Sequence, residues 1–257
     1  MKILPFPKRA PFTKSELVQP KLRGSDSLFG RGVGPFTLFK AVLILLSAVM
    51  MAVTFPMLRA EHAGLFSSFR DFADLEEATR SGPLPPALSR FVQVGQMWAC
   101  DGELFSPAAF EAEDDTATRV AEACLVRAEA ILDGVPTMSA AHQARATALY
   151  ALGETDEAVY AKALSRMTGP NEGGLALRRL GFAYQLASEA EVPFNLGDEA
   201  DAVLVLGSAG YRDYLVDLFL YYPDQRDWLI SVLQDQSENA DFLQSLRDRL
   251  AMEEGQG

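Results

Sequence analysis

Histidine and cysteine are scarce in this chain, with two residues of each among 257. His62 and His142 lie far apart and belong to no HExxH pattern, and the two cysteines form no CxxC pattern, so no metal site is indicated. The sequence also lacks a GxSxG elbow, a phosphate-binding loop and the kinase motifs. We therefore expect no catalytic residue, no metal and no cofactor, and we expect that the protein is not an enzyme.

Lysine is almost absent after residue 40, because five of the six lysines precede that point and only Lys162 follows it. Residues 1 to 40 contain eight basic and two acidic residues, whereas the remainder contains 15 basic and 33 acidic residues. A domain with such an acidic excess lacks the cations that replace phosphate counterions. The composition therefore argues against a nucleic-acid partner.

The sequence contains one long uncharged run, AVLILLSAVMMAVTFPML, between Lys40 and Arg59. As a helix, this run is roughly 27 Å long, close to the hydrocarbon thickness of a bilayer. Its apolar residues cover all faces, whereas a buried helix of a globular domain has one apolar stripe. We predict a transmembrane helix over residues 37–58, and the basic flank places residues 1–36 in the cytoplasm and the following domain outside.

A cleaved signal peptide is the alternative interpretation of this segment. The small residue Ala60 is suitable next to a cleavage site, but Leu58 is too large for the upstream position that such a site requires. The basic arm is also long for a signal peptide, and the apolar run exceeds the usual length. We favour the uncleaved membrane anchor.

The two cysteines, Cys100 and Cys124, both fall in the part of the chain that we place outside the membrane. In an oxidising compartment such a pair is a candidate disulfide. Two buried thiols in a helical core are the alternative, and the sequence does not decide between them.

The rest of the chain divides by composition. Residues 1–36 contain five prolines and no apolar period, which is typical of a disordered or extended arm. Residues 59–86 combine an apolar helical stripe that reaches Leu75 with the proline-rich run SGPLPP. Residues 87–252 form the folded domain, and residues 253–257 form a short tail.

Helical periodicity continues through the folded domain, and no alternating strand pattern appears, so we predict an all-α fold. Ser139 is expected to cap one helix, and Thr155 or Asp156 the next. The predicted helices are Leu88–Cys100, Thr116–Leu132, Ser139–Leu152, residues 155–168, Gly174–Ala190, Asp198–Leu206, Tyr211–Tyr222, Asp224–Gln234 and Glu238–Met252. Short connections between such helices favour antiparallel neighbours, and hence a succession of helical hairpins.

Two stretches of this domain resemble the tetratricopeptide repeat. GETDEA, from Gly153 to Ala158, is similar to the turn between the two helices of that repeat, and Pro170 falls where its second helix ends. LGFAY, from Leu180 to Tyr184, is similar to the first-helix signature of a following repeat.

The resemblance is partial and covers about sixty residues. The bulky and small first-helix positions of the family are occupied in the first unit by His142, Arg145, Ala146 and Leu149. In the second unit, Pro193 lies near the alanine that the second helix should contain. The resemblance implies an open helical solenoid with a concave surface for a peptide or protein. A closed helical bundle is the alternative.

Aromatic residues gather near the C-terminal end of the domain. Aromatic side chains serve as anchors at protein interfaces, although most residues in such a stripe pack in a core. The candidate partner-binding residues are Tyr211, Tyr214, Tyr221, Tyr222 and Trp228.

These features predict a bacterial inner-membrane scaffold with a cytoplasmic N-terminus and a periplasmic, repeat-like domain that binds another protein of the envelope. The bacterial setting is inferred from this anchored layout. Two alternatives remain: a periplasmic ligand-binding or enzyme-like domain with its pocket between helices, and a sensor that signals through the basic arm. The sequence does not predict the oligomeric state.

Overall fold

The computed structural model of the protein describes residues 35–66, 71–80, 82, 84, 87–208, 210–234 and 240–254. These residues form helices joined by turns and loops, with no strand among them, as the sequence predicted. The chain divides into two compact units, Met1–Ala52 and Val53–Gly257, which are considered separately below. The arm expected over residues 1–36 lies almost entirely outside the described residues.

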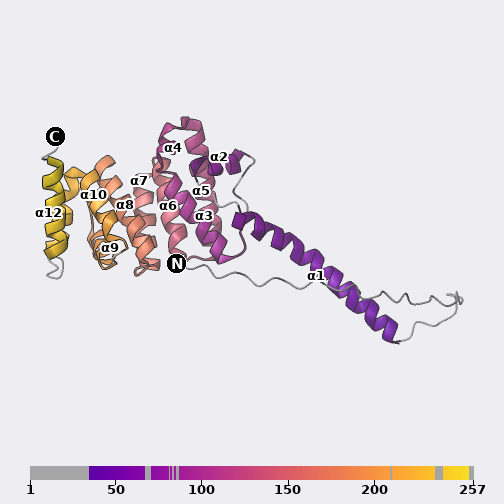
Figure 1. Ribbon diagram of the computed structural model, residues 1–257. Coiled ribbons are helices and arrows are strands. Elements are labelled where there is room, and N and C mark those ends of the chain that lie inside the picture. Colours follow the sequence, from indigo (N-terminus) through magenta and orange to yellow (C-terminus); the bar gives the residue numbers. More distant parts are fainter. Residues whose placement is uncertain are drawn as a thin grey trace, which may run out of the picture. The chain divides into compact units, whose positions relative to one another are not determined.

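The first helix, α1 (Pro35–Phe66), contains the long apolar run (Figure 1). The segment Phe39–Arg59 within it is long and apolar enough to cross a membrane, and its side chains are exposed on every side. The helix extends beyond the predicted boundary at residue 58, because nothing in the sequence after Arg59 stops it before Phe66.

The apolar stripe that we predicted downstream of this segment is divided between two helices. Leu65 and Phe66 belong to the end of α1, and Phe72 and Leu75 belong to α2 (Phe72–Arg80). Asp71 precedes α2, and its side chain accepts a hydrogen bond from the backbone N–H of Asp74, as a residue that caps a helix does. The prediction of one continuous helix through Leu75 was therefore wrong.

The second unit contains eleven more helical elements besides the end of α1, counted over its described residues. Their bounds agree with most of the predicted helices to within a few residues. They are α2, α3 (Arg90–Glu103), α4 (Pro107–Glu111), α5 (Asp114–Gly134), α6 (Ser139–Ala151), α7 (Thr155–Thr168), α8 (Gly173–Glu189), α9 (Leu196–Leu206), α10 (Arg212–Tyr221), α11 (Arg226–Gln234) and α12 (Ala240–Glu254). A short 3-10 turn, η1 (Pro223–Gln225), leads into α11, and α4 was not predicted.

Two of the predicted caps were wrong. The residue before α6 is Met138, and Ser139 is the first residue of the helix, where its hydroxyl donates to Glu172 Oε1 at 2.9 Å. A contact with a residue far along the chain therefore takes the place of the local cap. The residue before α7 is Glu154, which makes no side-chain capping bond.

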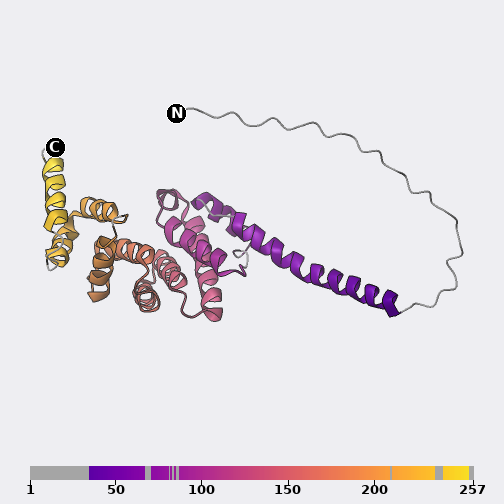
Figure 2. The ribbon, with the colours of Figure 1, turned by 60° about the horizontal axis from the view of Figure 1, so that its bottom comes forward.

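Helices that follow one another along the chain pack together in the second unit. Helix α6 contacts α7, α5 and α3, while α8 contacts α9, and α10 contacts both α8 and α9. Figure 2 shows the same order from a second direction, with the colours of this unit advancing regularly from α3 to α12. Alanine occupies many of the buried positions in α5, α6 and α7, and such small side chains allow neighbouring helices to approach closely.

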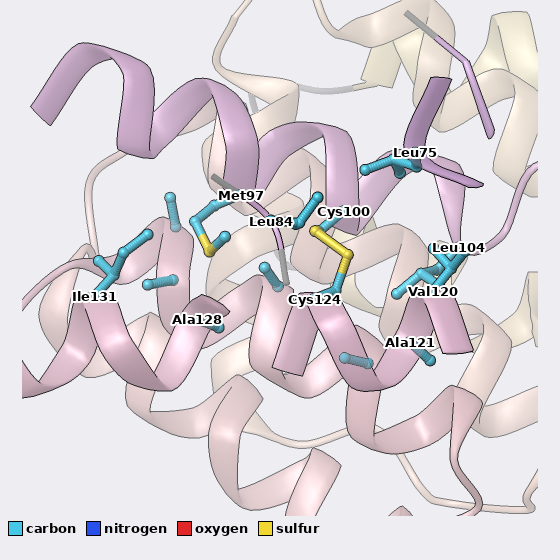
Figure 3. Close-up of a cluster of buried hydrophobic side chains, with 14 of the residues drawn as sticks. Leu75, Leu84, Met97, Cys100, Leu104, Val120, Ala121, Cys124, Ala128 and Ile131 are labelled. Carbon is cyan, nitrogen blue, oxygen red and sulfur yellow. A yellow bond between two sulfur atoms is a disulfide. The ribbon is translucent and has the colours of Figure 1, made fainter. Parts of the chain in front are cut away.

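A disulfide between Cys100 and Cys124 joins α3 to α5. Both cysteines are fully buried in a cluster that includes Met97, Val120 and Ile131 (Figure 3). Of the two alternatives that the sequence left open, the structure has the bonded pair. A second apolar cluster lies among α8 to α12, with Leu180, Tyr184, Leu215, Phe219 and Leu229 among its fully buried members.

Candidate partner-binding groove

Three adjoining hollows lie on one side of the helical unit, with cavity volumes of about 570, 490 and 230 Å³. All three are lined by Tyr222, and each pair shares further residues, so we treat them as one surface, the aromatic groove. Its residues come from α3, the segment before α4, α4, α8, α10 and η1, together with Tyr222 between α10 and η1. They are Asp101, Gly102, Phe105, Phe110, Arg178, Gly181, Phe182, Gln185, Ser188, Glu189, Tyr214, Asp217, Leu218, Leu220, Tyr221, Tyr222, Pro223, Asp224 and Gln225.

The structure separates the five aromatic candidates into two groups. Tyr214, Tyr221 and Tyr222 line the groove. Trp228 instead stacks on Phe194, with ring centroids 3.8 Å apart. Tyr211 packs against α8, where a Cβ added at Gly173 would lie 3.2 Å from its ring. These last two residues therefore serve packing, and the groove contains only the first three.

Aromatic rings form much of the groove wall. Phe105 lies 5.9 Å from Phe182 and 5.9 Å from Tyr150, measured between ring centroids, and Tyr150 lies 5.6 Å from Phe182. Tyr221 and Tyr222 meet edge to face with centroids 4.9 Å apart. The Tyr221 side chain is strongly exposed, at 78%. The groove thus presents an aromatic surface that solvent can reach.

A buried carboxylate joins three helices at one end of the groove. Asp101 Oδ1 accepts hydrogen bonds from Gln143 Nε2 at 3.0 Å and Thr147 Oγ1 at 2.6 Å, and Asp101 Oδ2 pairs with Arg178 Nη1 at 2.7 Å. The Arg178 guanidinium also lies 5.3 Å from the centroid of the Trp98 ring. This pair is electrically balanced, and it fixes α3, α6 and α8 to one another.

The groove carries a second hydrogen-bonded carboxylate on α8. Glu189 Oε2 accepts from the Tyr150 hydroxyl at 2.9 Å, and Gln185 Nε2 donates to both oxygens of Glu189 at 3.2 Å. Burial, together with the hydrogen bond to Glu189, raises the pKa of Tyr150 to about 12. Burial, with smaller effects from Tyr221 and Glu189, also raises the pKa of Tyr222 to about 12. Both phenols are therefore neutral near physiological pH.

Two further carboxylates, Asp217 and Asp224, are exposed at the rim. Neither has an ion-pair partner among the residues that the structure describes. Because Arg178 is already paired with Asp101, the charged lining leaves an excess of negative charge. The groove is therefore suited to a cationic group.

Gly181 allows α10 to approach α8 beside the groove. A Cβ at this position would overlap the hydroxyl oxygen of Tyr214. The glycine of the repeat-like signature thus has a local packing role, and it sets where one groove tyrosine lies.

A buried network of ion pairs connects α7, α8 and α9. Lys162 Nζ lies 2.7 Å from Asp198 Oδ1, and Arg179 bonds Asp201 with both Nε and Nη2, at 2.7 and 2.8 Å. Arg166 also pairs with Asp201. Arg179 and Asp201 are each only 1% exposed. These residues stabilise the packing of the three helices and do not line the groove.

None of these polar residues was predicted from the sequence. The sequence does contain one indication of the ion-pair network. Asp198 and Asp201 each lie four residues before a buried apolar residue, Ala202 and Val205 respectively, and therefore lie on the apolar face of α9. For the groove, Asp101 and Arg178 are 77 residues apart, and no local pattern links them.

The structure describes no group of three or more histidine, cysteine, aspartate or glutamate residues that is able to hold a metal ion, within the residues searched. His142 is nearly buried, and its Nε2 donates to the carbonyl oxygen of Pro136 at 2.9 Å. It therefore acts in packing within the first repeat-like unit. The side chain of His62 lies outside the described residues.

Comparison with known proteins finds no protein-family model that matches the chain, and no matching curated protein or solved structure.

Proposed function

We propose that this protein is a bitopic inner-membrane scaffold whose helical domain, on the periplasmic side, binds another protein of the bacterial envelope through the aromatic groove. The observation that carries this proposal is the combination of one long, predominantly apolar, exposed helix segment with a helical unit that presents a solvent-accessible aromatic groove. Exposed aromatic surface of this kind is characteristic of interaction sites.

The anchor is supported by the surroundings of Phe39–Arg59. Its side chains are exposed on all faces, and exposing so many apolar groups to water is unfavourable, whereas a bilayer accommodates them. The basic arm before this segment favours a cytoplasmic N-terminus. The disulfide between Cys100 and Cys124 supports an oxidising location for the following domain.

The repeat-like interpretation is supported by the helix contacts. Helices α6 and α7 pair, as do α8 and α9, and contacts also link α3 to α6, α6 to α8, and α8 to α10. In a solenoid of hairpins, these four helices are the first helices of successive units, and they line one face. The groove includes residues of three of these four helices, α3, α8 and α10.

A membrane anchor allows a groove of low affinity to bind its partner effectively. It confines the domain to a thin layer and raises its concentration relative to partners that occupy the same membrane. Modest contacts in the groove are then sufficient for a scaffold or assembly role in a motor, a secretion or polysaccharide apparatus, or a respiratory complex.

The test is crosslinking in intact membranes, followed by identification of the proteins that copurify. We expect reproducible envelope partners with the wild-type chain and their loss with Tyr221→Ala. Tyr160→Ala is the matched control, because Tyr160 is also exposed, at 63%, but lies on α7 outside the groove. If nothing copurifies while the purified protein binds or converts a small molecule, the scaffold proposal fails and the ligand-binding alternative replaces it.

A further inference from the structure

We infer that the groove binds an extended segment of the partner that carries arginine, with the guanidinium placed beside Tyr221 and Tyr222 and paired with Asp217 in one hollow or with Asp224 in the adjoining one. This inference rests on the proposed function and specifies the chemistry of its partner. It follows from the charges of the groove, the geometry of its tyrosines and the size of its hollows.

The charges favour a cation. Asp101 is neutralised by Arg178 at 2.7 Å, and Glu189 already accepts hydrogen bonds from neutral donors. Asp217 and Asp224 are exposed on either side of the Tyr221–Tyr222 pair in the sequence, and each lines a hollow that contains both tyrosines. A cationic side chain in either hollow gains a carboxylate partner, whereas an acidic segment meets only repulsion at these two residues.

The tyrosine pair provides a second attraction for the same group. Aromatic faces attract cations, and a guanidinium also stacks on them because it is planar. Among the described residues of the domain, Arg178 lies 5.3 Å from the Trp98 centroid and Arg226 lies 5.2 Å from the Phe219 centroid, and both are contacts of this kind. Arginine is preferred over lysine, because only the guanidinium combines stacking with two parallel hydrogen bonds to a carboxylate.

The hollows favour an extended segment rather than a helix. Their volumes, about 230 to 570 Å³, suit one or a few side chains each, and they adjoin one another through shared lining residues. An extended chain presents alternate side chains to adjoining hollows, whereas a helix presents a continuous cylinder. The hollow that contains Asp224 also contains Phe105 and Phe110, so an apolar residue near the arginine has a place to pack.

The direct test is peptide binding to the full-length protein in a nanodisc. The probe is a fluorescent peptide with two arginines spaced by prolines, which keep it extended, and its control carries citrulline in place of both arginines. Citrulline preserves the shape of arginine and removes the charge. We expect the arginine peptide to bind roughly tenfold more tightly than the citrulline peptide, with the difference decreasing as salt rises.

Two groove variants test whether the arginine peptide binds in the groove. The double variant Asp217→Asn with Asp224→Asn, and separately Tyr221→Ala, should each weaken binding of the arginine peptide by roughly tenfold. The matched controls, Asp156→Asn and Tyr160→Ala, change an exposed carboxylate and an exposed tyrosine on α7, outside the groove, and should leave binding unchanged. All these side chains are exposed, and circular dichroism verifies that each variant retains its helix content.

Equal affinity for the arginine and citrulline peptides overturns the inference, as does equal weakening by the groove variants and the α7 controls. If the peptides fail to bind while membrane crosslinking still traps a partner that Tyr221→Ala loses, the scaffold function stands and the arginine specificity is wrong. If crosslinking traps no partner either, the proposed function itself is contradicted.

Discussion

The buried charged residues of this domain are stable in the folded state only when their ion-pair partners are present. Arg179 bonds Asp201 through two of its nitrogens, and both side chains are almost completely buried. A buried ion pair adds little beyond a well-packed apolar pair, but removal of one partner leaves an uncompensated charge. The network therefore makes the packing of α8 and α9 specific to this arrangement of residues.

Replacement of Asp201 tests this dependence. Asp201→Ala leaves the Arg179 guanidinium buried without its carboxylate, so we expect a loss of about 3 kcal/mol in the free energy of unfolding. Asp213→Ala, which removes an exposed aspartate at the start of α10, should cost less than about 0.5 kcal/mol. Urea unfolding measures both variants, and a loss for Asp201→Ala no greater than that of the control contradicts the assigned role.

We expect His142 to make the stability of the domain sensitive to mild acid. Its Nε2 hydrogen bond leaves Nδ1 buried with no hydrogen-bond partner among the described residues. Burial, with a smaller effect from the charge of Arg145, lowers the pKa of His142 below its ordinary value of 6.5. Since the folded pKa is below the unfolded one, the stability from neutral His142 is complete above pH 6.5 and decreases as the pH falls through the folded pKa.

We predict that the stability of the wild-type protein and that of His142→Gln depend differently on pH. Between about pH 7 and about pH 5, the free energy of unfolding of the wild-type protein should decrease more steeply than that of His142→Gln, which cannot acquire this charge. Urea unfolding at several pH values measures both slopes. Parallel slopes would show that His142 does not change its pKa on folding.

Among the helices, the approach of α10 to α8 depends on one glycine. A Cβ at position 181 would overlap the Tyr214 hydroxyl, so Gly181→Ala should destabilise the domain by about 1 to 2 kcal/mol, even though alanine is the better helix former. Tyr214→Phe in the same chain removes the overlapping atom and should restore most of the loss. A double-mutant cycle of unfolding free energies measures this rescue, and additive effects of the two changes would exclude the proposed contact.

The disulfide connects α3 and α5 across 24 residues. Loss of this cross-link through Cys100→Ala with Cys124→Ala should lower the free energy of unfolding by about 3 kcal/mol. Reduction of the wild-type protein should give a similar loss, whereas a reductant should not affect the double variant. Unfolding curves with and without reductant test this, and no effect of reduction on the wild-type protein would contradict a bonded pair.

Most helices could be predicted from the sequence, because their apolar periods and their glycine and proline boundaries are local signals. The short helix α4 was missed, although Ser106 followed by Pro107 is a pattern that favours a helix start. Ser139 was misassigned as a cap because its acceptor, Glu172, lies 33 residues away. Local patterns identify a hydroxyl near a helix end, but they do not show which acceptor it finds.

The groove was predictable only in part. Tyr214, Leu218, Tyr221 and Tyr222 have the spacing of one helix face, and they line the groove together. Tyr211 has the same spacing, but its ring packs against Gly173 at the start of α8 and does not line the groove. The polar residues from α3 and α8 meet the tyrosines only through tertiary packing.

For the whole molecule, the proposed membrane orientation depends on the unequal distribution of charge around the apolar segment. Eight of the first 40 residues are basic, whereas the chain after them has 33 acidic residues against 15 basic ones. In the proposed orientation, retention of positive charge in the cytoplasm places the helical unit, with its disulfide and its groove, outside the membrane.

The most direct test of this topology is protease accessibility in bacterial cells whose outer envelope has been opened while the inner membrane remains sealed. Tags at the two ends of the chain report which part is cleaved. We predict that external protease degrades the C-terminal helical unit and leaves the N-terminal tag protected until the membrane is dissolved. A C-terminal unit that stays intact under these conditions, and is cleaved only after the membrane is dissolved, would contradict the orientation and the envelope-scaffold function built on it.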